Sequence, residues 1–253
     1  MYTDEQVWQI LDGLLVGADR RMDSVGDWAE HLDTEPLNLL VTRFVNQLDD
    51  EWYEADPPDA FCVALEGRVQ KRLAASGAGW PHVWAHTLRV TGFALALADE
   101  LHNRTRTANP DPVVVYALGL CHDVAKLDED RTGEPHEELG ARFAAQVLKD
   151  HLRPAQIAAI QAAITRESDD DLAHILADAD KLDKIGAAGV VRRVSAVSDR
   201  GDLSDALWQV SHAARYFPAM YFDLSRELAA RKRAFQAWFV PLAESIVDDI
   251  DDE

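Results

Sequence analysis

Apolar residues along this chain recur three and four positions apart, the spacing that places them on one face of an α-helix. Near the start the pattern comprises Val7, Ile10, Leu11, Leu14 and Leu15. An alternation with period two does not persist anywhere in the sequence, and no internal repeat is visible. The pattern therefore predicts an all-α protein.

Turn and capping residues divide this pattern into separate helices. Proline, glycine and Asx residues cluster at positions 56–59, 77–79 and 109–112, where they favour turns. The helices expected around these breaks cover about residues 37–52, 61–75, 80–102, 113–126, 136–150, 154–166, 169–186, 203–215 and 223–247. We interpret residues 1–75 as a helical N-terminal extension of unassigned role and residues 76–250 as the main domain.

Composition narrows the class of protein further. Hydrophobic residues make up 47% of the 253 residues, which is ample for a packed core. The formal net charge of -20 opposes broad binding to nucleic acids or to anionic membranes. The start lacks the pattern of a signal peptide, no stretch approaches the ~18 apolar residues of a membrane span, and only Cys62 and Cys121 are available for disulfides. We therefore expect a soluble, cytoplasmic protein.

Polar residues interrupt apolar helix faces at three separate places. The helix expected at 113–126 is apolar nearly all round, and it ends in His122 and Asp123. His86 lies within another helix with an apolar face, and Asp180 borders the apolar face of a third. Buried polar groups need partners, and one divalent cation would satisfy two imidazoles and two carboxylates together. This mixed donor set favours Mn, Fe, Co, Ni or Zn over Mg.

The same residues stand in motifs that resemble the HD phosphohydrolase family. HVWAHTLRV is similar to the family's opening H-D-x-x-H-x-x-R-V, and ALGLCHDVAKL to A-x-L-L-H-D-I-G-K. PHEELGARFA resembles the H-x-x-x-G-A element, and LADADKLDKIGA the D-A-D-x-L-D-x-x-G-A ending. The likeness covers roughly residues 80–245. It implies an HD-domain-like helical bundle with an N-terminal helical extension, in which His86, His122, Asp123 and Asp180 hold the metal.

The sequence departs from the family pattern in three places. Val83 stands where the opening motif usually has Asp. Members with two metals carry two further histidines, of which His136 matches one, whereas Thr165 occupies the region of the other. The G-Y-P motif of the cyclic-dinucleotide branch is also absent. The missing histidine in the region of Thr165 favours a single metal ion.

The resemblance implies hydrolysis of a phosphomonoester, phosphodiester or pyrophosphate bond by metal-activated water. The expected substrate is a small phosphorylated molecule, in particular a nucleotide. The expected catalytic residues are Asp123, Lys126 and Asp183. The expected substrate-binding residues are Arg89, Lys126, Lys181, His82 and His136. A homodimer is compatible with the large apolar fraction, although no heptad run requires one.

Each of these residues also has a structural interpretation. The four ligands could form a buried polar network without metal, and Lys126 could complement a helix dipole. His136 could simply begin a helix, and His82 could pack beside Trp84 instead of lining the pocket. The competing hypothesis for the whole chain is a catalytically weak or inactive HD module that binds a nucleotide or a partner protein as a sensor.

Overall fold

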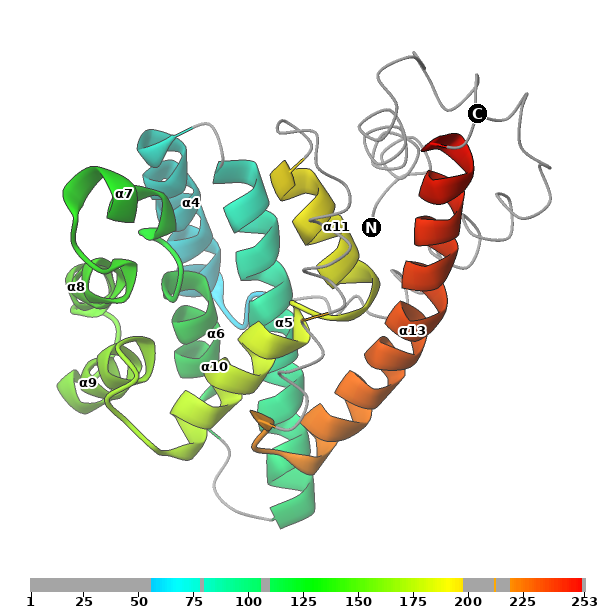
Figure 1. The fold of residues 1–253 in the computed structure, drawn as a ribbon. Coiled ribbons are helices and arrows are strands. Elements are labelled where there is room, and N and C mark those ends of the chain that lie inside the picture. The colour runs from blue at the N-terminus through cyan, green and yellow to red at the C-terminus, as the bar shows by residue number, and fades with distance from the viewer. Residues whose placement is uncertain (1–55, 78–79, 106–109, 198–211, 213–218, 252–253) are drawn as a thin grey trace. The chain divides into compact units, whose positions relative to one another are not determined.

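The computed structural model describes residues 56–77, 80–105, 110–197, 212 and 219–251 (Figure 1). Every regular element within these ranges is a helix, which confirms the predicted all-α class. The chain divides into two compact units. One includes Tyr53–Leu182 with Tyr221–Ser225, and the other includes Asp183–Met220 with Arg226–Glu253.

The first unit contains a bundle of helices and one short 3₁₀ turn. In chain order these are α4 (Ala60–Ser76), α5 (Trp80–Thr105), α6 (Pro112–Cys121), the 3₁₀ turn η1 (Lys126–Asp128), α7 (Glu129–Thr132), α8 (His136–Leu148), α9 (Pro154–Ile164) and α10 (Asp171–Leu182).

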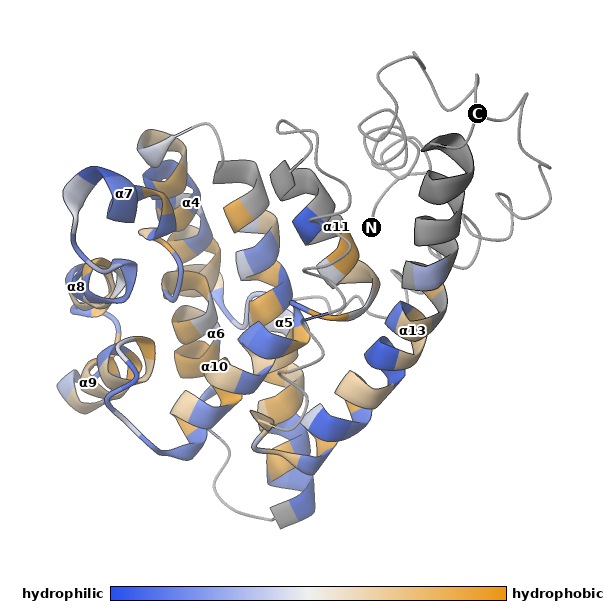
Figure 2. Cartoon of the chain, viewed as in Figure 1, coloured by the Kyte–Doolittle hydropathy of each residue, from blue (hydrophilic) through white to orange (hydrophobic). Residues whose placement is uncertain are grey.

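Helix α6 lies at the centre of this unit. Asp111 caps its first turn by accepting a hydrogen bond from the Val113 backbone N–H, and Pro112 occupies a first-turn position that needs no donor. All its residues from Val114 to Cys121 are buried, and the helix packs against α4, α5, α8, α9 and α10. Figure 2 shows the apolar turns of α6 in orange among these neighbours. The predicted central helix is confirmed.

The central helix ends earlier than its apolar pattern predicts. Regular α-helix stops at Cys121, and the chain then tightens into turns in which Val124, Lys126 and Asp128 donate backbone hydrogen bonds to carbonyls three residues earlier. The helix expected to reach residue 126 therefore becomes a compact turn. His122 and Asp123 stand at its beginning.

Helix α4 belongs to the same unit as the central helix. Its buried residues are Cys62, Leu65, Val69 and Leu73, and it contacts α5, α6 and η1. It therefore packs on the bundle although it lies before the predicted boundary near residue 76. Residues 1–55 lie outside the described ranges, so the two-part division of the chain stays a prediction.

The second unit includes α11 (Gly186–Val197) and most of α13 (Asp223–Asp251). Phe235 and Phe239 of α13 are buried and stack with ring centroids 5.6 Å apart. The buried Lys232 ammonium lies 3.4 Å from the Ile185 carbonyl oxygen. The helix expected at 203–215 falls almost entirely outside the described residues.

None of the described helices contains a long apolar stretch that could cross a bilayer.

Candidate metal centre

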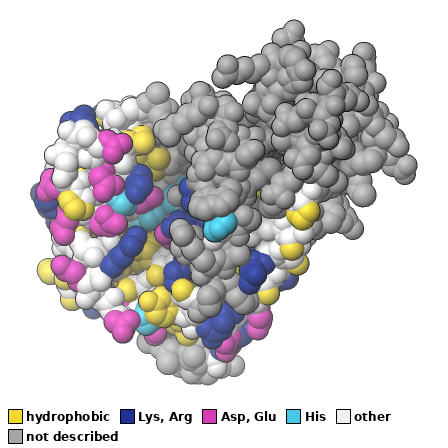
Figure 3. Space-filling model, viewed as in Figure 1, with side chains coloured by type: hydrophobic (Ala, Val, Ile, Leu, Met, Phe, Trp, Pro, Cys, Tyr) yellow, Lys and Arg dark blue, Asp and Glu magenta, His cyan; other side chains and the backbone are white. Residues whose placement is uncertain are grey.

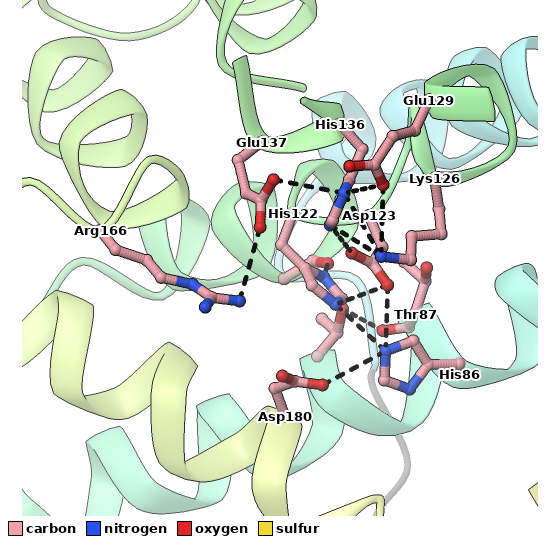
Figure 4. Close-up of polar contacts among 12 residues, drawn as sticks. His86, Thr87, His122, Asp123, Lys126, Glu129, His136, Glu137, Arg166 and Asp180 are labelled. Carbon is pink, nitrogen blue, oxygen red and sulfur yellow. Dashed lines mark hydrogen bonds and ion pairs between the residues drawn. The ribbon is translucent and has the colours of Figure 1, made fainter. Parts of the chain in front are cut away.

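Three helical segments bring the predicted metal ligands together (Figure 4). His86 comes from α5, His122 and Asp123 follow the end of α6, and Asp180 comes from α10. The two histidine Nε2 atoms are 3.3 Å apart. His86 Nε2 lies 3.5 Å from Asp123 Oδ2 and 3.5 Å from Asp180 Oδ1, and His122 Nε2 lies 3.9 Å from Asp123 Oδ2.

The donor atoms of His86, His122 and Asp123 lie close enough together to hold one cation, and Asp180 adjoins this group through His86. Ligands on metal bonds of about 2.1 Å are separated by about 3.0 to 3.4 Å in octahedral and tetrahedral sites. The observed separations lie at or slightly above that range. His122 Nδ1 donates to the Gly119 carbonyl oxygen at 2.7 Å, so the Nε2 lone pair faces His86. A backbone partner on the outer nitrogen is the arrangement that fixes a ligating histidine.

The protonation states suit metal binding as well. Burial lowers the pKa of His122 and outweighs the opposite effect of Asp123 and Asp180, so its imidazole is neutral near pH 7. Burial by itself raises the pKa of Asp123, but the surrounding imidazoles outweigh it and hold that pKa well below the usual value. A neutral imidazole and an ionised carboxylate are the forms that bind cations.

His136 supports Asp123 from the side away from the other ligands. It begins α8 and is buried, with Nε2 3.2 Å from Asp123 Oδ1. Its Nδ1 lies 2.8 Å from Glu129 Oε2 and 3.2 Å from Glu137 Oε2. Burial alone lowers the pKa of His136, but the hydrogen bond and charge of Asp123 outweigh it and raise that pKa. One oxygen of Asp123 is thus bound by His136 while the other faces His86 and His122.

Glu129, His136 and Glu137 form a second group whose donor atoms lie close enough to hold a cation. Lys126 joins this group, with Nζ 3.2 Å and 3.3 Å from the two ring nitrogens of His136 and 3.8 Å from Glu129 Oε2. Since Lys126 already places one positive charge here, the group is less suited to a cation than the ligand cluster that contains Asp180.

The two aspartates of the D-A-D motif have different surroundings. Asp178 is fully buried and accepts hydrogen bonds from the backbone N–H groups of Tyr221 at 2.8 Å and Phe222 at 3.0 Å. It therefore anchors the segment before α13. Asp180 is partly exposed and faces His86. Only Asp180 of this pair lies at the ligand cluster.

The remaining predicted residues lie at various distances from this cluster. Lys181 Nζ is 3.5 Å from Asp178 Oδ1 and 4.7 Å from the Tyr221 ring centre, so it reaches toward the anchored segment. Arg89 and Asp183 are buried, and Asp183 belongs to the second unit. The His82 side chain lies outside the described residues. Their roles stay predictions.

Sequence reasoning missed Glu129, Glu137 and Arg166, which the structure places around His136. Arg166 lies 3.6 Å from Glu137 through its guanidinium NH2 group. Glu137 follows His136 directly in PHEELG, so its position was a usable signal. Glu129 begins the four-residue helix α7, and Arg166 follows the end of α9. No hydrophobic period indicates the direction of a side chain at either position.

Comparisons with known proteins give a matching family model and similar solved structures. The family model described as HD domain matches residues 83–185. A crystal structure of a predicted HD superfamily hydrolase from an uncultured Thermotogales bacterium is 24% identical, with 69% of this chain and 88% of that chain covered and a TM-score of 0.51. The structure of Bacillus subtilis YpgQ in complex with ADP is 22% identical, with coverage of 73% and 94% and a TM-score of 0.57.

Comparison with curated proteins gives no match. The family model matches the segment that contains all four predicted ligands. Both solved structures share the helical fold of this chain. Residues 83–185 therefore belong to the HD-domain family.

Proposed function

We propose that this protein is a metal-dependent phosphohydrolase whose ion is held by His86, His122, Asp123 and Asp180. The observation that carries the proposal is the convergence of two imidazole nitrogens and two carboxylate oxygens from three helical segments, with neighbouring donors 3.3 to 3.9 Å apart. A structural polar network would not need the two Nε2 atoms to face each other.

A divalent ion in this position supplies Lewis acidity, which activates water and neutralises charge on a phosphoryl group. The protein's own residues set the geometry. Gly119 fixes the His122 ring through its carbonyl oxygen, and His136 fixes the Asp123 carboxylate. Lys126, with a side chain 42% exposed, adds a cation that a substrate phosphate can reach.

We propose a single ion, of Mn, Fe, Co, Ni or Zn. Thr165, at the region where two-metal relatives carry a histidine, directs its hydroxyl to the Gln161 carbonyl oxygen at 3.1 Å, within its own helix. His136 is engaged by Asp123, Glu129 and Glu137. The mixed nitrogen and oxygen donor set supports these metals over Mg.

We propose a nucleotide as substrate, cleaved at a phosphoester or pyrophosphate bond. The support is the fold likeness to YpgQ, which was solved in complex with ADP. Hydrolysis would act on a small molecule and not on a nucleic acid, since the chain carries a net charge of -20.

The test measures metal content, metal affinity and turnover on a panel of nucleotides and simple phosphoesters with Mn²⁺. The variant Asp123→Ala should lose activity by more than the roughly 10–100-fold that removal of an outer partner costs. It should also bind Mn²⁺ far more weakly while its far-UV circular dichroism is retained. Asp150→Ala, at an exposed turn after α8, is the matched control.

Wild-type turnover by Asp123→Ala would rule the site out. Tight Mn²⁺ binding by the wild-type protein, without hydrolysis of any compound on the panel, would favour the alternative of a nucleotide-binding sensor. The departures at Val83 and Thr165 motivate that alternative.

A further inference from the structure

Arg166 has a backbone conformation that its residue type disfavours. Helix α9 ends at Ile164, with Thr165 as its cap. The Glu167 N–H then bonds the Ala162 carbonyl oxygen at 2.9 Å, and the Arg166 N–H bonds that of Ala163 at 3.4 Å. This hydrogen-bond pair closes a helix with a left-handed residue, usually glycine. Here that residue is Arg166, with φ of 60°, and among the described residues no other non-glycine has positive φ.

The Arg166 side chain points from the end of α9 toward the group of predicted metal ligands (Figure 4). Its guanidinium lies 3.6 Å from Glu137 Oε1, and the other oxygen of Glu137 lies 3.2 Å from His136 Nδ1. His136 in turn bonds Asp123. Arg166 is thus three polar contacts away from a predicted metal ligand, although it is distant from the metal motifs in sequence.

The exposure of the Arg166 guanidinium and its distance from Glu137 leave it able to bind an anion. The side chain is 76% exposed, and a separation of 3.6 Å from Glu137 is longer than a charge-assisted hydrogen bond. Exposed ion pairs of this kind contribute little to stability. Stabilisation of the fold therefore does not account for an arginine at a position where glycine would be unstrained.

Two other cations near the predicted ligands have closer polar partners than Arg166 has. Lys126 lies against His136 and Glu129, and Lys181 reaches toward Asp178. Figure 3 shows Lys and Arg side chains close to histidines on this face, where acidic side chains are also frequent. A phosphate that approaches so acidic a protein needs a local positive group, and guanidinium binds phosphate through two parallel hydrogen bonds.

We propose that Arg166 is a substrate-binding residue that holds a phosphate group of the substrate and is directed toward the site by Glu137 in the absence of substrate. The inference rests on the proposed function only for the statement that the substrate is phosphorylated. The left-handed conformation of Arg166 at the end of α9 directs this side chain toward the predicted metal ligands.

The test compares Arg166→Gly with wild type and with Arg153→Gly, which removes the same charge from the opposite end of α9. Calorimetry with Mn²⁺ alone and then with inorganic pyrophosphate measures the two affinities, and thermal unfolding in EDTA measures stability. Arg166→Gly should bind pyrophosphate at least about 10-fold more weakly, because a bidentate charged contact is lost. Its Mn²⁺ affinity should equal that of wild type, and its Tm should rise by about 2–4 °C as strain is relieved.

Arg153→Gly should leave the pyrophosphate affinity unchanged. Unchanged pyrophosphate binding by Arg166→Gly, or absence of pyrophosphate binding in the wild type, would overturn the proposal. A lower Tm together with weaker Mn²⁺ binding would also overturn it, because Arg166 would then be a structural residue. If Arg166 governs pyrophosphate binding but no substrate is hydrolysed, the inference stands and the proposed hydrolase function fails.

Discussion

At the scale of single residues, one buried carboxylate outside the predicted metal site connects a helix of the bundle to a turn. Asp128 is fully buried and receives hydrogen bonds from Arg72, from Arg131 at 2.7 Å and from Ser76 at 3.2 Å. Arg72 and Ser76 belong to α4, so one carboxylate joins α4 to the turn that follows His122 and Asp123, two predicted metal ligands. When the charge of a buried carboxylate is removed and its charged partners remain, the folded protein loses much of its stability.

We expect Asp128→Asn to lower the free energy of unfolding by about 2–4 kcal/mol. Urea unfolding in EDTA at pH 7 measures the change. Asp130→Asn, at an exposed position of α7, should change stability by less than about 0.5 kcal/mol. Equal stability of Asp128→Asn and wild type would show that the ion pairs of Asp128 contribute nothing.

The pKa of Asp128 also predicts how the stability of the protein depends on pH. Burial alone raises the pKa of Asp128, but hydrogen bonds from Arg131 and Arg72 outweigh it and lower that pKa. Its contribution is therefore fully present above the unfolded pKa of about 3.9 and is lost as pH falls through the lower folded value. The stability difference between wild type and Asp128→Asn should shrink below about pH 4, and a constant difference would contradict this assignment.

At the scale of helices, the close approach of α5 and α6 positions the first two histidines. A Cβ on Gly119 would lie 2.5 Å from Thr91 Oγ1 and 2.8 Å from its Cα. The same glycine presents the carbonyl oxygen that orients His122. The absence of a side chain at Gly119 thus permits the close helix spacing, and its carbonyl oxygen orients His122, a predicted metal ligand.

Gly119→Ala should lower the free energy of unfolding by about 1–3 kcal/mol, because the added methyl group overpacks this crossing. It should also weaken Mn²⁺ binding through the displaced His122 ring. Gly67→Ala is the control: a Cβ there meets nothing within 4 Å on the exposed face of α4, so it should stabilise the helix by about 0.5–1 kcal/mol. Chemical unfolding and calorimetry measure both effects. Equal effects of the two substitutions would refute the role of the crossing.

At the scale of the whole molecule, a bound ion should link segments that are far apart in the sequence. Its predicted ligands lie at positions 86, 122, 123 and 180, and the ion would join three helical segments of one unit. A ligand that binds only the folded state adds stability that increases with its concentration.

Mn²⁺ at 100 times its dissociation constant should stabilise the wild-type protein by about 2.7 kcal/mol. The Tm should rise with metal concentration and return to its starting value in EDTA. Differential scanning fluorimetry of wild type and Asp123→Asn measures this dependence, and the variant should show little response. A variant that responds as the wild type does would show that the ion binds elsewhere.

The local pattern of this sequence determined the all-α class, the central position of α6 and the candidate metal ligands, because apolar periodicity and motif order are readable within single segments. Only the tertiary structure decided which polar residues meet. It separated Asp178, which anchors a chain segment, from Asp180, and it joined Glu129 and Glu137 to His136. It also directed Arg166 toward the cluster. Such contacts depend on where helices end and how they cross, and helical periodicity alone carries neither property.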